Sequence, residues 1–362
     1  MNTDFLIIGG GIAGVSVAAR LSHLGQVTLL EAEDQLAYHA SGRSAALYEP
    51  SYGPPAIKSL SLASGDYLKS AHGGVLSPRG LMLVAGNDRA AGYEAQAADL
   101  GLTQISIEAA LAKVPTLAPD ALGFVAFSDH AHDLDTDLLV QNFRREGRAQ
   151  GANLICGARA QSITKTATGW QVVTRKGAFE GRILVNAAGA WVDEVAVMAG
   201  VAPLGFTPLR RSMARIPAPG GHDVSSWPML FGAGESWYAK PDAGALIVSP
   251  SEEHRMVPHD AFADDMVLAE GLARYEAFST APVTRLLSSW AGLRTFSPDR
   301  SPVAGWALDC PAFFWLAGQG GYGFQSAPAL SQLAADLITG AATSADAATV
   351  AALSPGRFGA SA

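Results

Sequence analysis

The chain has little cysteine, no strong excess of charge of one sign and no long apolar run. Its two cysteines, Cys156 and Cys310, stand far apart, which excludes a disulfide framework and a four-cysteine metal site and favours a reducing compartment. Lys and Arg number 25 against 33 Asp and Glu, giving a formal charge of -8. A modestly acidic chain lacks the basic surface that binds nucleic acid. No stretch approaches the ~20 apolar residues that cross a bilayer.

The first residues also lack the features of a secretory signal. After Met1-Asn2-Thr3-Asp4 the chain enters a strand-like run, with no basic region and no small-residue cleavage site. We therefore expect a cytoplasmic protein without a transmembrane segment and without a nucleic-acid partner. A content of 49% hydrophobic and 16% charged residues over 362 residues is typical of a folded chain with room for two intertwined domains.

The opening predicts a strand, a glycine turn, a helix and a second strand. Phe5–Ile8 is a short apolar run, followed by Gly9-Gly10-Gly11-Ile12-Ala13-Gly14 and by a proline-free run to Leu24. Val27–Leu30 is then a second strand-like run that ends in Glu31. The glycines match G-x-G-x-x-G, in which the first makes a tight turn, the second lets a pyrophosphate approach and the third allows close packing.

This context makes the glycine motif more specific than the pattern alone. The N-terminus of the following helix offers free N–H groups and a positive dipole end to phosphates. Glu31 stands where an acidic residue accepts a hydrogen bond from a ribose 2′-OH, and its charge disfavours a 2′-phosphate. The alternative is a glycine-rich turn without a nucleotide. The sequence therefore predicts a dinucleotide site at the start of the chain.

The rest of the chain alternates between antiparallel-sheet and αβ character. Strand-like runs occur at 80–85, 123–129 and 208–216, with a hairpin at 236–250. Residues 133–200 and 313–338 read as αβ elements. We predict an α/β (α+β) fold: a discontinuous Rossmann-like dinucleotide-binding domain at 1–78, 133–203 and 291–345, with an inserted antiparallel-sheet substrate domain at 79–132 and 204–290. The tail at 346–362 is rich in Ala, Ser and Thr, and we expect it to be loosely ordered.

Two further motifs have simple interpretations. Gly318–Gly323 repeats the G-x-G-x-x-G pattern, but no strand with an acidic end follows its helix. We expect it to bring a helix N-terminus against the same dinucleotide. Asp129–Asp137 contains two histidines and several carboxylates, which could suggest zinc or iron. Because Asp135 and Thr136 precede an apolar-periodic run, we expect a solvated loop with a helix N-cap, and no metal.

Several motifs in the same order carry a resemblance to a known family. They are the Gly9–Gly14 turn with Glu31, the run from Tyr38 to Ala46, the run from Leu184 to Trp191, Arg210-Arg211-Ser212, the stretch from Tyr238 to Gly244, Trp290 to Arg294, and Gln319 to Gly323. The chain resembles the D-amino acid oxidase-like family of FAD-dependent oxidoreductases. Within it the resemblance is strongest to bacterial D-arginine dehydrogenase-type D-amino acid dehydrogenases.

The resemblance implies that FAD is held non-covalently in a long cofactor site. Cys310 does not match the position of covalent flavin attachment in some sarcosine oxidases. The implied cofactor contacts come from the glycine turn, the second strand, the run after Tyr38 and two later glycine-rich segments: Gly9, Gly11, Ile12, Ala13, Gly14, Glu31, Ala32, Ser41, Gly42, Arg43, Ser44, Ala45, Ala188, Gly189, Trp191, Arg294, Gly320, Gly321, Tyr322, Gly323 and Phe324.

Four residues match substrate-contacting positions of the family. Arg294 matches the arginine that clamps the α-carboxylate, a task for which a planar guanidinium is suited. Tyr52, Tyr238 and Arg211 match further substrate contacts. Each has a structural alternative: Arg294 could form an ion pair within the protein, Tyr238 could be an ordinary strand aromatic, and Tyr52 lies in a Pro-rich loop with the composition of a lid.

The substrate pocket, which would include Leu47, Leu81 and Gly321, departs from the D-arginine-specific pattern. Leu81 replaces an acidic residue and Leu47 replaces a histidine. Without a counter-charge, a substrate cation beside apolar side chains costs several kcal/mol. We therefore expect a neutral or apolar side chain to be preferred, unless Glu49 reaches the pocket and restores a preference for bases.

The implied reaction is oxidative deamination of a D-amino acid by hydride transfer from Cα to flavin N5. It gives an imino acid, which water converts to a 2-oxo acid and ammonia. The electron acceptor would be oxygen or a quinone or other carrier. Two alternatives stay open: an enzyme acting on sarcosine or another N-methyl or secondary amino acid, and a non-catalytic flavin-binding subunit.

Overall fold

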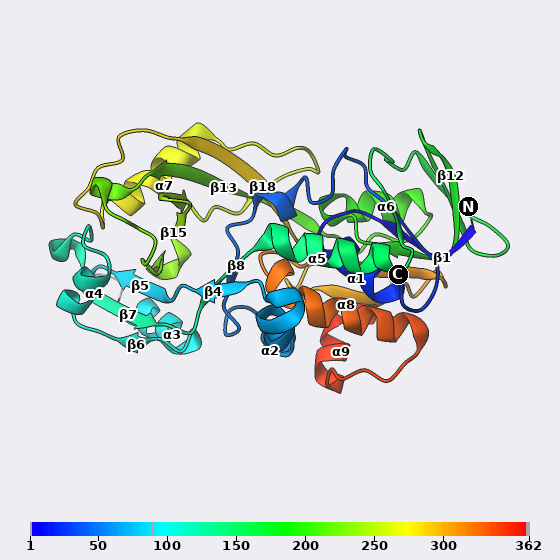
Figure 1. Cartoon of the computed structure of the whole chain (residues 1–362), viewed down its shortest axis with the longest axis horizontal. Coiled ribbons are helices and arrows are strands. Elements are labelled where there is room, and N and C mark those ends of the chain that lie inside the picture. The colour runs from blue at the N-terminus through cyan, green and yellow to red at the C-terminus, as the bar shows by residue number, and fades with distance from the viewer. Residues whose placement is uncertain (1, 88–89, 360–362) are drawn as a thin grey trace.

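The computed structural model describes residues 2–87 and 90–359 and has two lobes, with both chain ends in the same lobe (Figure 1). The predicted opening unit is present as β1 (Asn2–Ile8), α1 (Ile12–Leu21) and β2 (Val27–Leu30). β1 is buried on both faces because Phe5 and Ile7 face one apolar core while Leu6 and Ile8 face a second one. Such a strand needs no polar alternation, which is why its sequence is uniformly apolar.

β1 lies at the centre of a sheet that builds the first lobe. Its neighbours β2 and β12 run parallel to it, with Ile8 beside both Leu30 and Asn186, so the carboxyl ends of the three strands meet at one edge. The strand order and bounds are β10 (Ser162–Lys165), β11 (Trp170–Thr174), β12 (Gly177–Asn186), β1, β2 and β9 (Asn153–Ile155), while β20 (Phe313–Ala317) also pairs with β12, and β19 (Val303–Trp306) with β20.

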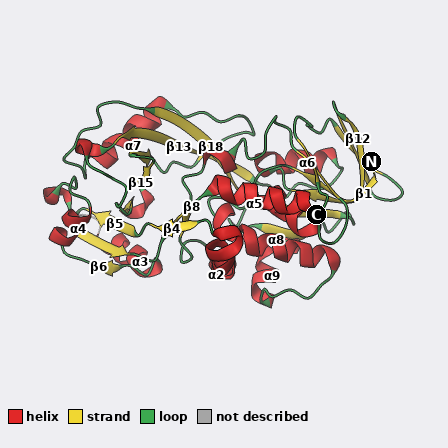
Figure 2. Ribbon diagram, viewed as in Figure 1, coloured by secondary structure: helices red, strands yellow, loops and turns green. Residues whose placement is uncertain are grey.

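Helices cover both faces of this sheet (Figure 2). One core joins β1 to α1, α5 (Thr136–Ala149) and α8 (Gly323–Thr339), and the other joins it to α6 (Val192–Met198). α2 (Pro55–Ser70) packs on α8. The α/β fold predicted from the sequence is confirmed.

The second lobe is built on a larger, mostly antiparallel sheet. Its order and bounds are β17 (His254–Arg255), β13 (Thr207–Pro217), β16 (Ala245–Ser249), β15 (Tyr238–Asp242), β14 (Met229–Gly232), β5 (Leu81–Ala85), β7 (Phe124–Ser128) and β6 (Thr103–Gln104), with β18 (Ser288–Phe296) along β13. α3 (Ala90–Asp99), α4 (Ile107–Lys113) and α7 (Asp265–Glu276) complete this lobe.

The two lobes are connected by long strands and a small sheet. β13 and β18 pair over nine positions and extend from the second lobe toward the first (Figure 1). Between the lobes, β3 (Leu47–Tyr48), β8 (His132–Leu134) and β4 (Leu76–Pro78) form a three-stranded sheet. The exact division at residues 78, 132, 203 and 290 stays a prediction.

Two local expectations have clear outcomes. Asp135 is the N-cap of α5, since its carboxylate accepts a hydrogen bond from the Leu138 N–H at 2.9 Å. The expectation of a loosely ordered tail is wrong for the described part of it. Asp346 caps α9 (Ala347–Leu353), and Leu353 is fully buried in the core of the first lobe. Val350 and Ala352 also pack against that core, so burial of one face together with the cap orders this short alanine-rich helix. Within residues 2–87 and 90–359, no helix is long and apolar enough to span a membrane.

Candidate cofactor and substrate site

The turn between β1 and α1 requires glycine for steric reasons. Gly9 has φ 108, and a β-carbon there would lie 2.4 Å from the carbonyl oxygen of Ala187. A β-carbon on Gly14 would lie 1.8 Å from the carbonyl oxygen of Gly9. The Ser41 hydroxyl accepts a hydrogen bond from the Ile12 N–H at 3.0 Å and thereby orders the helix start. The turn is thus shaped for the close approach of a ligand to the backbone.

A cavity of about 300 Å³ opens beside this turn, at the carboxyl ends of β1 and β2. Glu31 lines it and is held by two backbone donors: Gly10 N–H to Oε2 at 2.6 Å and Glu33 N–H to Oε1 at 2.8 Å. Burial raises the pKa of the Glu31 carboxyl, and these hydrogen bonds oppose the rise. Each oxygen keeps a second lone pair, so the carboxylate can still accept from a ribose hydroxyl.

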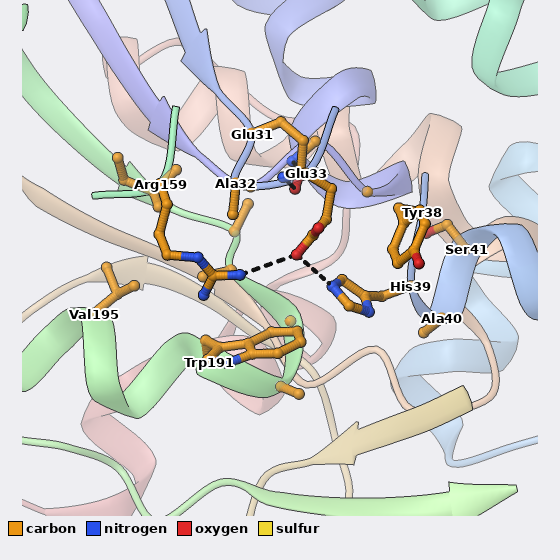
Figure 3. Close-up of a pocket in the computed structure, with 18 of the residues that line it drawn as sticks. Glu31, Ala32, Glu33, Tyr38, His39, Ala40, Ser41, Arg159, Trp191 and Val195 are labelled. Atoms are coloured by element: carbon orange, nitrogen blue, oxygen red, sulfur yellow. Dashed lines mark hydrogen bonds and ion pairs between the residues drawn. The ribbon is translucent and has the colours of Figure 1, made fainter. Parts of the chain in front are cut away.

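A polar network in this cavity was not foreseen from the sequence (Figure 3). Glu33 Oε1 lies 3.1 Å from His39 Nε2 and 3.0 Å from Arg159 Nη2. The imidazole of His39 also packs on Trp191, with ring centroids 4.6 Å apart. These groups come from distant parts of the chain and surround the hollow with aromatic and charged side chains, as a nucleoside site requires.

A second cavity continues from the first toward the other lobe. Its volume is about 130 Å³, and it shares the walls formed by Gly11, Ser41 and Gly292 with the first. The N-terminus of α8 borders it through Gly320–Gly321 and Gly323–Phe324. Within the described residues, three buried polar atoms of the lining residues, Arg211 Nε, Thr295 Oγ1 and Gln319 Nε2, have no hydrogen-bond partner. Unpartnered buried polar atoms indicate that a polar ligand completes this wall.

A third cavity of about 70 Å³ ends the row and shares Ser44, Arg211, Arg294 and Gly321 with the second. The pairing of β13 with β18 explains why the two arginines meet. Leu209 is opposite Arg294 and Arg211 is opposite Gly292, which places both guanidiniums on the same face in diagonal positions. Tyr238 reaches the cavity from β15, beside its cross-strand neighbour Phe231.

The third cavity has an excess of buried positive charge at one end. Burial, and then the nearby charge of Arg294, lower the pKa of Arg211. Arg211 Nη2 lies 3.2 Å from Glu253 Oε1, whereas no carboxylate of residues 2–87 and 90–359 lies within ion-pair distance of Arg294. Burial raises the pKa of Tyr52, so its phenol stays protonated and can donate a hydrogen bond. An anionic ligand suits this end.

The same cavity also contains carboxylates that the sequence only suggested. Leu47 lines the cavity, while Leu81 is fully buried and is not among the lining residues. Glu49 and Glu235 do line it. The predicted preference for neutral side chains depended on a pocket without a counter-charge, and Glu49 supplies one.

Other predicted residues lie as follows. Most of the predicted cofactor contacts line one of the three cavities, whereas Gly14, Gly42 and Tyr322 are not among the lining residues. Gly14 acts through packing, and the Tyr322 ring lies 5.3 Å from the Tyr52 ring. Arg43 lines the first two cavities, but its guanidinium donates to the carbonyl oxygens of Ala261 at 2.7 Å and Ala291 at 3.0 Å.

Neither cysteine lines the three cavities, which agrees with a cofactor held without a covalent bond. Among the described residues, no group of three or more His, Cys, Asp or Glu side chains is arranged to hold a metal ion. The site is therefore a continuous row of cavities, about 300, 130 and 70 Å³ in volume, that ends at two arginines.

Residues 4–337 match the family described as "FAD dependent oxidoreductase" (DAO). The chain belongs to this family. Its cofactor is FAD, and the row of cavities has the groups to hold it: the glycine turn and Glu31 for the adenosine half, and the unpartnered Thr295 and Gln319 atoms nearer the arginines.

Curated relatives of the chain are distant and have varied names. It is 23% identical to FAD-dependent oxidoreductase domain-containing protein 1 of Bos taurus, over 93% of this chain and 81% of that protein. It is 25% identical to the bifunctional protein ThiO/ThiG of Trichormus variabilis, over 93% of this chain and 53% of that protein.

Solved structures share the fold at low sequence identity. L-alpha-glycerophosphate oxidase from Mycoplasma pneumoniae, solved with FAD bound, has a TM-score of 0.83 at 20% identity, covering 94% of this chain and 95% of that one. Glycine oxidase from Geobacillus kaustophilus has a TM-score of 0.82 at 20% identity, covering 96% and 98%. L-proline dehydrogenase from P. horikoshii has a TM-score of 0.83 at 20% identity, covering 99% and 98%.

Proposed function

We propose that this protein oxidises the Cα–N bond of a small D-amino acid. The observation that carries the proposal is a pair of guanidiniums, those of Arg294 and Arg211. They line the third cavity, which adjoins the two larger cavities assigned to FAD (the cofactor row). Arg294, which has no carboxylate within ion-pair distance among the residues that the structure describes, is suited to bind a substrate carboxylate in bidentate fashion. The resemblance to D-amino acid dehydrogenases supports this assignment.

The protein contributes placement more than acid–base chemistry. Arg294 and Arg211 hold the carboxylate, and the phenols of Tyr52 and Tyr238 line the same cavity, where the Tyr238 hydroxyl donates to Met213 Sδ at 3.3 Å. The Tyr52 hydroxyl donates to Glu235 Oε2 at 3.2 Å, which orients the ring at the cavity wall. When bound, FAD would supply the acceptor for a hydride, which is the α-hydrogen with its two bonding electrons. Fixing the carboxylate and the α-carbon in one orientation supplies much of the rate enhancement.

The balance of the reaction is simple. The α-hydrogen and two electrons leave the amino acid, one ammonium proton passes to water, and the product is an imino acid. Water then converts the imino acid to a 2-oxo acid and ammonium. Oxygen or a quinone-type carrier takes the two electrons in the second half-reaction.

A second candidate is oxidation of sarcosine or another secondary amino acid. The two arginines favour it equally, because they recognise the carboxylate and not the amine. The same carboxylate clamp would serve both reactions.

Anaerobic mixing of the holoenzyme with a panel of amino acids tests the proposal. The panel contains both enantiomers of several amino acids, glycine and sarcosine. We expect D-amino acids to bleach the flavin absorbance and their L-enantiomers to be much slower. Bleaching only by sarcosine would favour the second candidate, and no bleaching by any member would contradict both.

A further inference from the structure

Glu49 combines burial with access to the substrate cavity. Its side chain is only 4% exposed, yet it is one of the lining residues. Its Oε1 accepts the Ser51 N–H at 3.0 Å, and its own N–H donates to Gln325 Oε1 at 3.1 Å. The carboxylate is therefore fixed in position on the wall.

His130 holds the other oxygen from outside the cavity. Its Nε2 lies 2.5 Å from Glu49 Oε2, and its Nδ1 lies 2.5 Å from the Ser128 hydroxyl. If the hydroxyl donates to Nδ1, the proton of the neutral ring is on Nε2, where it donates to the carboxylate. In this tautomer the pair carries a single negative charge.

The environment decides whether Glu49 can stay ionised. Burial raises the pKa of its carboxyl, while the charge that His130 carries when its ring is protonated, the Ser51 N–H, the hydrogen bond from His130 and the charge of Lys58 lower it. A buried carboxylate is tolerated when such donors satisfy it. Each Glu49 oxygen accepts one hydrogen bond from the protein, which leaves lone pairs for a ligand.

We infer that Glu49, positioned by His130, recognises the distal end of the substrate side chain and selects a cationic donor group over an apolar one. This rests on the proposed function, which docks the substrate carboxylate at Arg294. Glu235 adds a second carboxylate to the same cavity, and Leu47, Met229 and Phe231 line its apolar part. His130 does not line the cavity, so it is a positioning residue that acts through Glu49.

Matched carboxylates that lack an α-amino group test this without any oxidation. 5-Aminopentanoate and 6-aminohexanoate are compared with pentanoate and hexanoate by calorimetry on the holoenzyme. For at least one pair we expect the ω-amino compound to bind about tenfold tighter or more, because a charged donor meets a buried carboxylate. Equal binding, or tighter binding of the alkyl carboxylate in both pairs, would overturn the inference.

Variants separate the two roles. Glu49→Gln keeps the shape and removes the charge, so the affinity ratio should fall to about one. His130→Leu should reduce the ratio several-fold with Glu49 intact, and His130→Gln, which restores an N–H donor, should recover part of it. The matched control is His132→Asn. The His132 imidazole contacts the His130 carbonyl oxygen at 2.9 Å and not Glu49, so the ratio should not change.

Two results would contradict the assignment of roles. One is a ratio that Glu49→Gln leaves unchanged, and the other is equal ratios in His130→Leu and wild type. If Glu49→Gln does not retain FAD, the two His130 variants decide. A holoenzyme that shows the expected ratio but is not reduced by any amino acid would refute the proposed function alone. Reduction by D-amino acids, together with equal binding of the ω-amino and alkyl carboxylates, would refute this inference alone.

Discussion

Arg294 is the residue on which substrate binding depends most directly. Replacing it with methionine keeps much of the side-chain length but removes the charge and both donor edges. Losing one partner of a buried charged pair costs about 2–5 kcal/mol, so kcat/KM for the best D-amino acid should fall by about 30-fold to several thousand-fold. Steady-state kinetics on the FAD-loaded variant measure this.

Lysine at position 294 should be less harmful than methionine, since it keeps the charge but not the bidentate geometry. Arg255→Met, an exposed arginine on β17, is the matched control and should leave kcat/KM within about twofold. An Arg294→Met enzyme with normal kcat/KM would show that the carboxylate binds elsewhere.

For single residues, the sequence predicted which residue types matter better than it predicted where their side chains point. The glycine turn, Glu31 and Arg294 could be identified because each has a fixed position within a motif. Leu81 was placed in the pocket, but the pairing of β5 with β14 and β7 buries it completely. The Glu33–His39–Arg159 network joins residues up to 126 positions apart, and no local pattern indicates such a contact.

Among the segments, residues 256–263, between β17 and α7, close one side of the first cavity. His259 and Ala261 line that cavity. Asp260 forms an ion pair with Arg43 and accepts a hydrogen bond from the Tyr38 hydroxyl at 3.3 Å. The hydrogen bond from Arg43 holds the pKa of the Asp260 carboxyl below its usual range. These contacts hold the segment, which belongs to the second lobe, against the first lobe.

Asp260→Ala should speed the release of FAD. An exposed ion pair contributes about 0.2–1 kcal/mol, so the dissociation rate should rise by up to about fivefold. The increase in flavin fluorescence after dilution of the holoenzyme measures that rate. Asp265→Ala, an exposed change in the first turn of α7, is the control and should not alter it. Equal release rates in Asp260→Ala and wild type would show that the segment does not retain the cofactor.

Element boundaries were predictable where a chemical signal marks them. The sequence indicated the N-cap at Asp135 and the strands between residues 5 and 30. It did not give the end of α1, which lies at Leu21, three residues before the predicted Leu24. The tail was misjudged because its composition is that of a linker, while its order comes from Leu353 packing against the first lobe. Tertiary packing of this kind overrides local composition.

On the scale of the whole molecule, the walls of the cofactor row come from parts of the chain that are far apart in sequence. The cofactor row is lined by residues from Ile8 to Phe324 and by both lobes. A ligand that binds only the folded chain stabilises it by RT ln(1 + [L]/Kd), or about 2.7 kcal/mol at a hundredfold excess over Kd.

Apoprotein should therefore melt several degrees below holoenzyme, and the difference should grow with added FAD. Differential scanning calorimetry at several FAD concentrations measures this. AMP at the same concentrations is a suitable control, because it can occupy only the adenosine end and should shift the Tm less. A Tm independent of FAD would contradict the assignment of the row to this cofactor.

Helix α8 connects the cofactor row with the pocket for the amino acid. Its first residues, Gly323 and Phe324, border the cofactor row, and one residue later Gln325 accepts from the Glu49 N–H and donates to the Tyr52 carbonyl oxygen at 3.3 Å. If FAD binding shifts the start of α8, these two hydrogen bonds transmit the shift to the loop that carries Glu49 and Tyr52. Because such linkage is reciprocal, we expect FAD and the amino acid to favour each other's binding, and an empty enzyme should discriminate poorly among amino acids.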